Sequence, residues 1–125
     1  MERKTRQQEA ISLVLKESDM PLTPQEVLLR AKKHVSNIGI ATVYRGLKRL
    51  LELNLVALVE IPGTPPHYES TEKRHHHHFV CRSCEKIFDI DGCIDGVDNI
   101  APKNFKVDSH EITLYGICVK CLPDS

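Results

Sequence analysis

Two Cys-x2-Cys pairs near the end of the chain constrain its fold more than any other feature of the sequence. Cys81 and Cys84 form the first pair, and Cys118 and Cys121 form the second. Two intervening residues let both thiolates of a pair reach one ion, and two such pairs complete a tetrahedral all-sulfur site. A redox dithiol would need only one pair in a thioredoxin-like βαβ context, which the sequence lacks. We therefore expect a structural zinc (Zn2+) site.

The start of the chain and its apolar runs favour a cytoplasmic protein with no membrane partner. The first ten residues, MERKTRQQEA, lack the apolar run of a secretory signal, and no stretch approaches the roughly 20 apolar residues of a membrane span. In a reducing compartment, five cysteines favour metal or redox chemistry over a disulfide framework. The length of 125 residues suits one ordinary domain or two small ones.

The first half of the chain has the pattern of three short helices followed by a β-hairpin. Apolar residues at three- and four-residue steps predict a helix beginning at Thr5, and Thr23 with Glu26 resembles a capping box at the start of a second. After a third helix, β-type runs at 55–61 and 67–70 predict a hairpin. This order is typical of a winged helix-turn-helix, whose third helix enters the major groove of DNA.

The predicted third helix has an apolar face and a polar, basic face. The basic face carries Thr42, Tyr44, Arg45, Lys48 and Arg49. Residues 1–50 contain ten Lys or Arg and five Asp or Glu, which is the charge balance of a polyanion binder. From the pattern alone, a DNA-binding surface and an ordinary solvated face fit this helix about equally well.

The second half of the chain predicts a separate α/β unit. We expect a DNA-binding domain at 1–70, a polar hinge at 71–74 and a metal-binding dimerisation domain at 75–125. The expected elements of the last part are strands at 75–81 and 86–90, a short helix at 93–100, and one or two strands within 105–118. About fifty residues are too few to rely on their own core, so a metal or dimerisation must add stability. The predicted fold class is α+β.

Four consecutive histidines, His75–His78, begin the first strand predicted in this unit. Because successive side chains of a strand point to opposite faces, His76 and His78 share one face, and His75 and His77 share the other. One ion cannot collect all four, so two sites are more natural than one. Other candidate ligands by residue type are His67, Glu69, Asp89, Asp91, Asp95 and His110. Zinc, iron and manganese all suit such ligands, and a strand that binds metal only adventitiously is the alternative.

Three separated motifs resemble the ferric uptake regulator family of metal-responsive repressors. They are ATVYR at 41–45, HHHHFVCRSC at 75–84 and LYGICVKC at 114–121. The resemblance covers nearly the whole chain. It implies an N-terminal winged-helix DNA-binding domain, a C-terminal dimerisation domain, and a homodimer that binds a palindromic DNA operator when metal is present.

The resemblance also assigns residues to these functions. The structural zinc site would be Cys81, Cys84, Cys118 and Cys121. The sensing site would be Glu69, His76, His78 and Asp89, and an additional site would be His75, His77, Asp95 and His110. Lys4, Tyr44 and Arg45 match positions from which relatives contact DNA. The sensed ion would be Zn2+ or Fe2+, with Mn2+ as a further candidate.

The sequence departs from the family pattern in three ways. Many relatives have an additional N-terminal helix, which is missing here. Iron- and peroxide-responsive members often supply a sensing histidine where this chain has Met20–Pro21, so coupling would run through other residues such as His67 or Glu69. Cys93 has no place in the pattern: it is either a sensing ligand, which would favour zinc, or a buried bystander.

We interpret the chain as a repressor of metal-uptake genes, with zinc or iron as corepressor. The missing histidine and the extra cysteine favour the zinc uptake branch of the family. A zinc-dependent metalloenzyme would need an open metal position beside a general base, and no HExxH-type motif is present. A metal-storage protein would not need the winged-helix half. We therefore expect no enzymatic activity.

Overall fold

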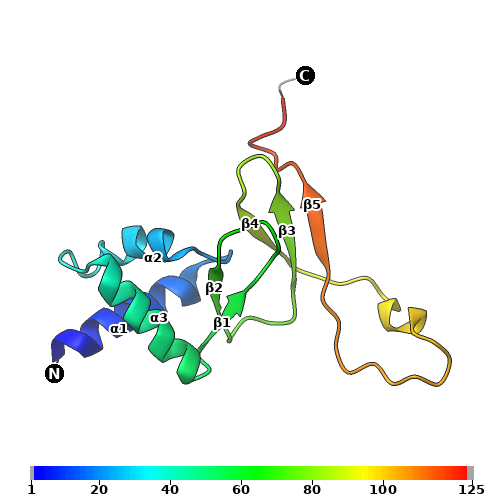
Figure 1. Ribbon diagram of the computed structural model, residues 1–125, viewed down its shortest axis with the longest axis horizontal. Coiled ribbons are helices and arrows are strands. Elements are labelled where there is room, and N and C mark those ends of the chain that lie inside the picture. Colours follow the sequence, from blue (N-terminus) through cyan, green and yellow to red (C-terminus); the bar gives the residue numbers. More distant parts are fainter. Residues whose placement is uncertain (1, 124–125) are drawn as a thin grey trace. The chain divides into compact units, whose positions relative to one another are not determined.

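A computed structural model describes residues 2–123 of the chain, with side chains from residue 6 onward. The chain separates into two compact units, one ending at Lys73 and one beginning at Arg74. The first unit contains three α-helices and a two-stranded hairpin, and the second contains a three-stranded sheet and a short 3-10 helix (Figure 1). The predicted α+β class is confirmed. Among the helices of these residues, none has the length and apolar character needed to span a bilayer.

The helices of the first unit lie where the apolar periodicity predicts them, to within a few residues. They are α1 (Glu2–Glu17), α2 (Pro24–Ala31) and α3 (Ile40–Glu52). The capping box at the start of α2 forms as expected. The backbone N–H of Glu26 donates to Oγ1 of Thr23 at 3.2 Å, and the N–H of Thr23 donates to Oε1 of Glu26 at 3.0 Å. These bonds satisfy two donors that the first helical turn leaves open, which fixes where α2 begins.

The three helices enclose one apolar core. Its buried members are Ile11, Val14, Leu15, Leu22, Val27, Ala31, Ile38, Val43, Leu47, Leu50 and Val56. Gly46 lets α1 and α3 approach closely, because a Cβ atom at this position would lie 2.5 Å from Cδ1 of Ile11. Burial of the apolar face of α3 leaves its basic face toward solvent.

A hairpin follows the helices and is joined to them by hydrogen bonds. Strands β1 (Val56–Val59) and β2 (His67–Ser70) pair antiparallel. The backbones of Leu22 and Tyr68 exchange two hydrogen bonds of 2.9 and 2.7 Å, which connect β2 to the loop between α1 and α2. Three helices with an attached hairpin make the winged helix-turn-helix that the sequence predicts.

The second unit is built on a small sheet with the strand order β4-β3-β5. The central strand β3 (His77–Cys81) pairs antiparallel with β4 (Ile87–Ile90) and parallel with β5 (Thr113–Gly116). Among the described residues of this unit, the buried apolar side chains are those of Val80, Cys81 and Ile87. Such a small core agrees with the expectation that other interactions must stabilise this unit.

Some elements of the second unit are shorter than expected. β3 begins at His77 rather than at residue 75, because its pairing with β4 ends at the pair formed by His77 and Ile90. The helix expected at 93–100 is wrong, since only a 3-10 helix, η1 (Val97–Ile100), forms there. Gly96 adopts the left-handed conformation, with φ of 77°, and so interrupts a helical backbone at this point. The long segment after η1 contains one strand, β5.

Candidate metal centres and DNA-binding face

The four paired cysteines lie together at one end of the sheet. Cys81 ends β3, Cys84 lies in the following turn, and Cys118 and Cys121 come after β5. Because β3 and β5 run parallel, with Cys81 opposite Gly116, both pairs emerge at the same end. The four Sγ atoms lie within 4.8 Å of one another, and those of Cys84 and Cys118 are 3.9 Å apart. Sulfur ligands of a tetrahedral zinc ion are roughly 3.8 Å apart, so the four thiols fit one ion.

The surroundings of these thiols give them unequal proton affinities. Hydrogen bonds from the backbone N–H groups of Cys84 and Cys118, each 3.4 Å from Sγ of Cys81, lower the pKa of the Cys81 thiol to about 6. A hydrogen bond with Ser83 lowers the pKa of Cys121, but contacts with Cys118, burial and the other thiols outweigh it and raise that pKa to about 11. One thiolate therefore forms readily, whereas four require a cation among them.

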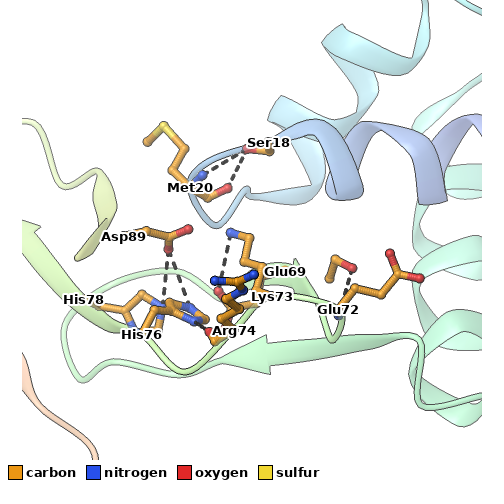
Figure 2. A network of polar contacts seen from close by, with 10 residues as sticks. Ser18, Met20, Glu69, Glu72, Lys73, Arg74, His76, His78 and Asp89 are labelled. Carbon is orange, nitrogen blue, oxygen red and sulfur yellow. Dashed lines mark hydrogen bonds and ion pairs between the residues drawn. The ribbon is translucent and has the colours of Figure 1, made fainter. Parts of the chain in front are cut away.

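His76, His78 and Asp89 converge on one face of the sheet in the second unit. The register of β3 and β4 places His78 opposite Asp89. Oδ1 of Asp89 lies 3.7 Å from Nε2 of His76 and 3.7 Å from Nε2 of His78 (Figure 2). The side chains are largely buried: Asp89 is 10% exposed, His76 14% and His78 16%. Nδ1 of His76 donates to the carbonyl oxygen of Arg74 at 2.7 Å, which orients the ring with Nε2 toward Asp89.

Glu69, the remaining residue of the predicted sensing site, belongs to the first unit. It lies in β2 opposite Ala57, and its Oε2 atom is 3.7 Å from the ammonium nitrogen of Lys73 (Figure 2). His67, the candidate extra ligand at the start of β2, is buried. Its Nδ1 donates to the carbonyl oxygen of Pro65 at 2.6 Å, so one of its ring nitrogens is engaged within the hairpin.

The opposite face of the histidine run gathers a third set of side chains. His75, His77, Cys93 and His110 each offer one ligand atom, and these atoms lie within 4.8 Å of one another. Sγ of Cys93 is 3.2 Å from Nε2 of His77 and 3.0 Å from Nε2 of His110. Burial, followed by the neighbouring histidines, lowers the pKa of His77, which favours the neutral imidazole that binds metal.

This third set differs from the one that the family resemblance implies. Asp95 is exposed and is not brought together with the three histidines, whereas Cys93 is. The reason is the path of the loop after β4, which brings Cys93 against His77 two residues before Asp95 is reached. The sequence contained one signal for this arrangement, since Cys93 is the single cysteine without a partner at Cys-x2-Cys spacing.

The polar face of α3 is open to solvent. Tyr44, Arg45, Lys48 and Arg49 are exposed, and Thr42 is half-buried. The guanidinium of Arg45 donates to Oγ1 of Thr42 at 3.2 Å, and that of Arg49 lies 3.6 Å from the carboxylate of Glu52. The side chain of Lys4, also predicted to contact DNA, lies outside the described residues.

A cleft of about 350 Å³ is lined by residues of this face of α3 and of α1. The residues that line it are Gln7, Gln8, Ile11, Thr42, Arg45, Gly46 and Arg49. Two arginines and two glutamines here offer hydrogen-bond donors of the kind that contact phosphates and base edges. The first unit thus presents the chemistry expected of a DNA-binding surface.

Comparison with known proteins identifies the family. The model of the ferric uptake regulator family matches residues 2–115. The chain belongs to the ferric uptake regulator family. It is 35% identical over 122 residues to the ferric uptake regulation protein of Campylobacter upsaliensis, covering 94% of this chain and 78% of that protein. It is 34% identical over 122 residues to the zinc uptake regulation protein of Mycobacterium tuberculosis, covering 95% of this chain and 94% of that protein.

Solved structures agree with this assignment. The ferric uptake regulator of Helicobacter pylori, whose structure is described as revealing three functional metal binding sites, matches with a TM-score of 0.76 and 28% identity, over 92% of this chain and 79% of that chain. Members of this family are metal-responsive transcription regulators and not enzymes. The family and the absence of an enzymatic role are as the sequence predicts. Since relatives named for iron and for zinc are about equally similar, the comparisons do not separate the two metals.

Proposed function

We propose that this chain represses metal-uptake genes by binding a palindromic DNA operator as a homodimer, with zinc as the favoured corepressor and iron(II) as the alternative. One observation carries the proposal: Glu69 lies in the wing hairpin, and the second unit, which opens with the histidine run, begins only five residues later at Arg74. An ion held by His76, His78 and Asp89 that also recruits Glu69 would tie the DNA-binding unit to the dimerisation unit.

Such an ion acts by preferring one arrangement of the two units. It shifts the population toward the DNA-binding arrangement only by the difference between its affinities for the two states. A preference of about a hundredfold is worth about 2.7 kcal/mol at 25 °C. By linkage, operator DNA must then tighten metal binding by the same factor.

The proposed DNA contacts follow from the exposed face of α3. We place α3 in the major groove, where the forked guanidinium of Arg45 suits the acceptor edge of guanine. Lys48 and Arg49 are assigned to phosphates, and Tyr44 and Thr42 to the neighbouring bases or backbone. Lys4, near the start of α1, is proposed to add a phosphate contact.

The proposed dimer interface is the β5 side of the second unit. β5 is an edge strand, and exposed apolar side chains lie on it and after it, at Leu114, Tyr115 and Ile117. An unpaired edge with exposed apolar side chains is a surface that proteins normally cover. The four-cysteine zinc site that we propose at the end of β5 would hold this edge in place.

The choice of zinc rests on two features of the sequence. Met20–Pro21 stands where iron-responsive relatives often have a sensing histidine, and Cys93 adds a thiol that favours zinc over iron. Mn2+ remains a third candidate, because the nitrogen and oxygen ligands of the sensing site suit Zn2+, Fe2+ and Mn2+ alike.

The test begins with protein purified without added metal and analysed for its metal content. The preferred DNA sequence is selected from a random library, and its affinity is then measured by fluorescence anisotropy during titration with Zn2+, Fe2+ or Mn2+. We expect a palindromic site and an affinity that rises at least tenfold with zinc at a lower free concentration than with the other ions. DNA binding that is independent of every metal would contradict the proposal.

A further inference from the structure

The third set of side chains, His75, His77, Cys93 and His110, has the composition and spacing of a metal site that contains a thiolate. The nearest ligand atoms are 3.0 to 3.2 Å apart: Cys93 Sγ to His110 Nε2, His77 Nε2 to Cys93 Sγ, and His75 Nε2 to His110 Nε2. Nitrogen and sulfur ligands of a tetrahedral zinc ion are separated by roughly 3.3 to 3.6 Å. These three separations therefore fall short of that geometry by only a few tenths of an ångström, and all four ligand atoms lie within 4.8 Å of one another.

The hydrogen bonds around His110 provide a second, independent indication. Its Nδ1 donates to Oδ1 of Asp98 at 2.9 Å, which fixes the ring tautomer and leaves Nε2 as a lone pair directed at Cys93. A carboxylate behind a histidine is the usual support for a metal-binding imidazole, because it orients the ring and raises its basicity. Asp98 thus prepares His110 as a ligand without touching the ion itself.

His77 is less well prepared than His110. The backbone N–H of Ile112 donates to its Nδ1 at 3.1 Å, so the ring proton lies on Nε2 and faces the sulfur of Cys93. If an ion binds Nε2, the ring proton must move to Nδ1. Nδ1 can then no longer accept the hydrogen bond from the N–H of Ile112. We therefore expect His77 to contribute less to affinity than His110.

We propose that these four residues bind Zn2+ through three imidazoles and the Cys93 thiolate, and that Cys93 determines the metal preference of the site. A thiolate favours zinc over the harder ions Mn2+ and Fe2+, and three nitrogens with one sulfur complete a tetrahedral sphere. Binding releases the thiol proton of Cys93 to solvent. This site shares no ligand with the sensing set or with the four-cysteine set.

The position of the ligands in the chain indicates what the ion does. Cys93 and His110 stand at the two ends of a segment whose described regular structure is the single turn of η1, and whose Ile100 and Phe105 are exposed. His75 and His77 come from the start of the central strand. One zinc ion therefore fastens both ends of this long segment to β3, in a part of the unit that has little apolar core of its own.

The test uses cobalt(II) as a spectroscopic probe in the full-length protein, with zinc retained in the four-cysteine site and verified by elemental analysis. A thiolate bound to tetrahedral cobalt gives a near-ultraviolet charge-transfer band, which the sensing set cannot produce because it contains no cysteine. We expect one equivalent of cobalt to produce this band in the wild type. Asp95→Ala is the matched control, since it removes an exposed carboxylate of the same loop, and it should leave the band unchanged.

The decisive variant is Cys93→Ser. It should lose the charge-transfer band and should bind zinc at this site at least about a hundredfold more weakly in competition with a chromophoric chelator, because even outer-shell partners are worth about 10- to 100-fold. Asp98→Asn should keep the band but weaken affinity about 10- to 100-fold, as a positioning residue would.

Three results would overturn the proposal: an unchanged band in Cys93→Ser, loss of the band in Asp95→Ala, or no band in the wild type. Circular dichroism of each variant excludes misfolding as the cause. No DNA enters this assay, and Cys93→Ser retains His76, His78 and Asp89. A failure here is therefore separate from a failure of metal-dependent operator binding.

Discussion

Cys118→Ser tests the four-cysteine site most directly, and the structure sets the size of the expected effect. The substitution leaves three thiolates, and it keeps the backbone N–H of residue 118 that donates to Sγ of Cys81. Structural zinc supplies on the order of 10 kcal/mol to small domains. Full burial of Val80 and Ile87, the main apolar core of this unit, supplies about 3 to 6 kcal/mol in total. The ion therefore outweighs the core.

We expect Cys118→Ser to lose its zinc and, with it, the folded second unit and the dimer. The first unit has a larger apolar core and should remain folded. The measurements are metal content, molar mass by light scattering, and thermal unfolding by calorimetry, in which one transition should disappear and one should persist. Limited proteolysis should release a resistant fragment that ends near Lys73.

Val119→Ala is the matched control for this experiment. Val119 is adjacent to Cys118 in the chain but is 83% exposed, so its truncation should change neither zinc content nor melting temperature. The assignment is refuted if Cys118→Ser retains one equivalent of zinc, its dimer and both unfolding transitions.

Three further predictions concern DNA binding and the sensing site. Arg45→Ala should weaken operator binding by about 1–3 kcal/mol and relax the base preference at one position. Lys48→Ala should weaken binding to all DNA sequences equally and reduce its salt dependence. Equal effects of Arg45→Ala on operator and random DNA in anisotropy titrations would contradict base readout. His76→Ala should abolish metal-stimulated operator binding and keep the dimer, while His75→Ala should mainly lower the melting temperature; identical loss of switching in both would mean one merged site. Lys73→Met should tighten metal binding at the sensing site severalfold in chelator competition. In the wild type the ammonium of Lys73 lies 3.7 Å from the carboxylate of Glu69 and competes with an ion for it. An unchanged or weaker affinity would show that the ammonium does not compete.

The parts of the fold that the sequence predicts well are those with local causes. The capping box at Thr23, the apolar face of α3 and the hairpin are each determined by residues a few positions apart, and each forms as expected. The ends of β3 were less predictable, because a strand extends only as far as its neighbours pair with it, and β4 ends at Ile90. The left-handed conformation of Gly96 likewise appears only in the folded backbone.

The metal-binding sets show the same division between local and distant causes. Alternation along the histidine run separates His76 and His78 from His75 and His77, and the ring contacts agree, since the rings within each pair have centroids 4.8 and 4.6 Å apart. Which distant residue joins each pair depends on the path of the loops. The choice of Cys93 over Asp95 was therefore not contained in the spacing of ligands or in the family pattern.

The central strand explains why the second unit can have so little apolar core. β3 and the two residues before it contribute to all three sets: alternate histidines to two of them and Cys81 to the third. The other ligands of this unit come from its neighbours. Asp89 and Cys93 lie in β4 and the loop beyond it, Cys84 lies in the turn between β3 and β4, and His110, Cys118 and Cys121 lie in the segments around β5. Ions bound at these sets would therefore join the same three strands that hydrogen bonds already connect, and would replace apolar burial as the source of stability.

The ligand types then separate stability from sensing. The two sets that contain cysteine would hold zinc tightly through at least one thiolate, and loss of that zinc would loosen the sheet or the long loop. The set of His76, His78 and Asp89 contains only nitrogen and oxygen ligands from the second unit, so it can exchange its ion without disturbing the thiolate sites. A regulator must release its corepressor when the metal becomes scarce while remaining folded, and this distribution of sulfur among the three sets meets that requirement.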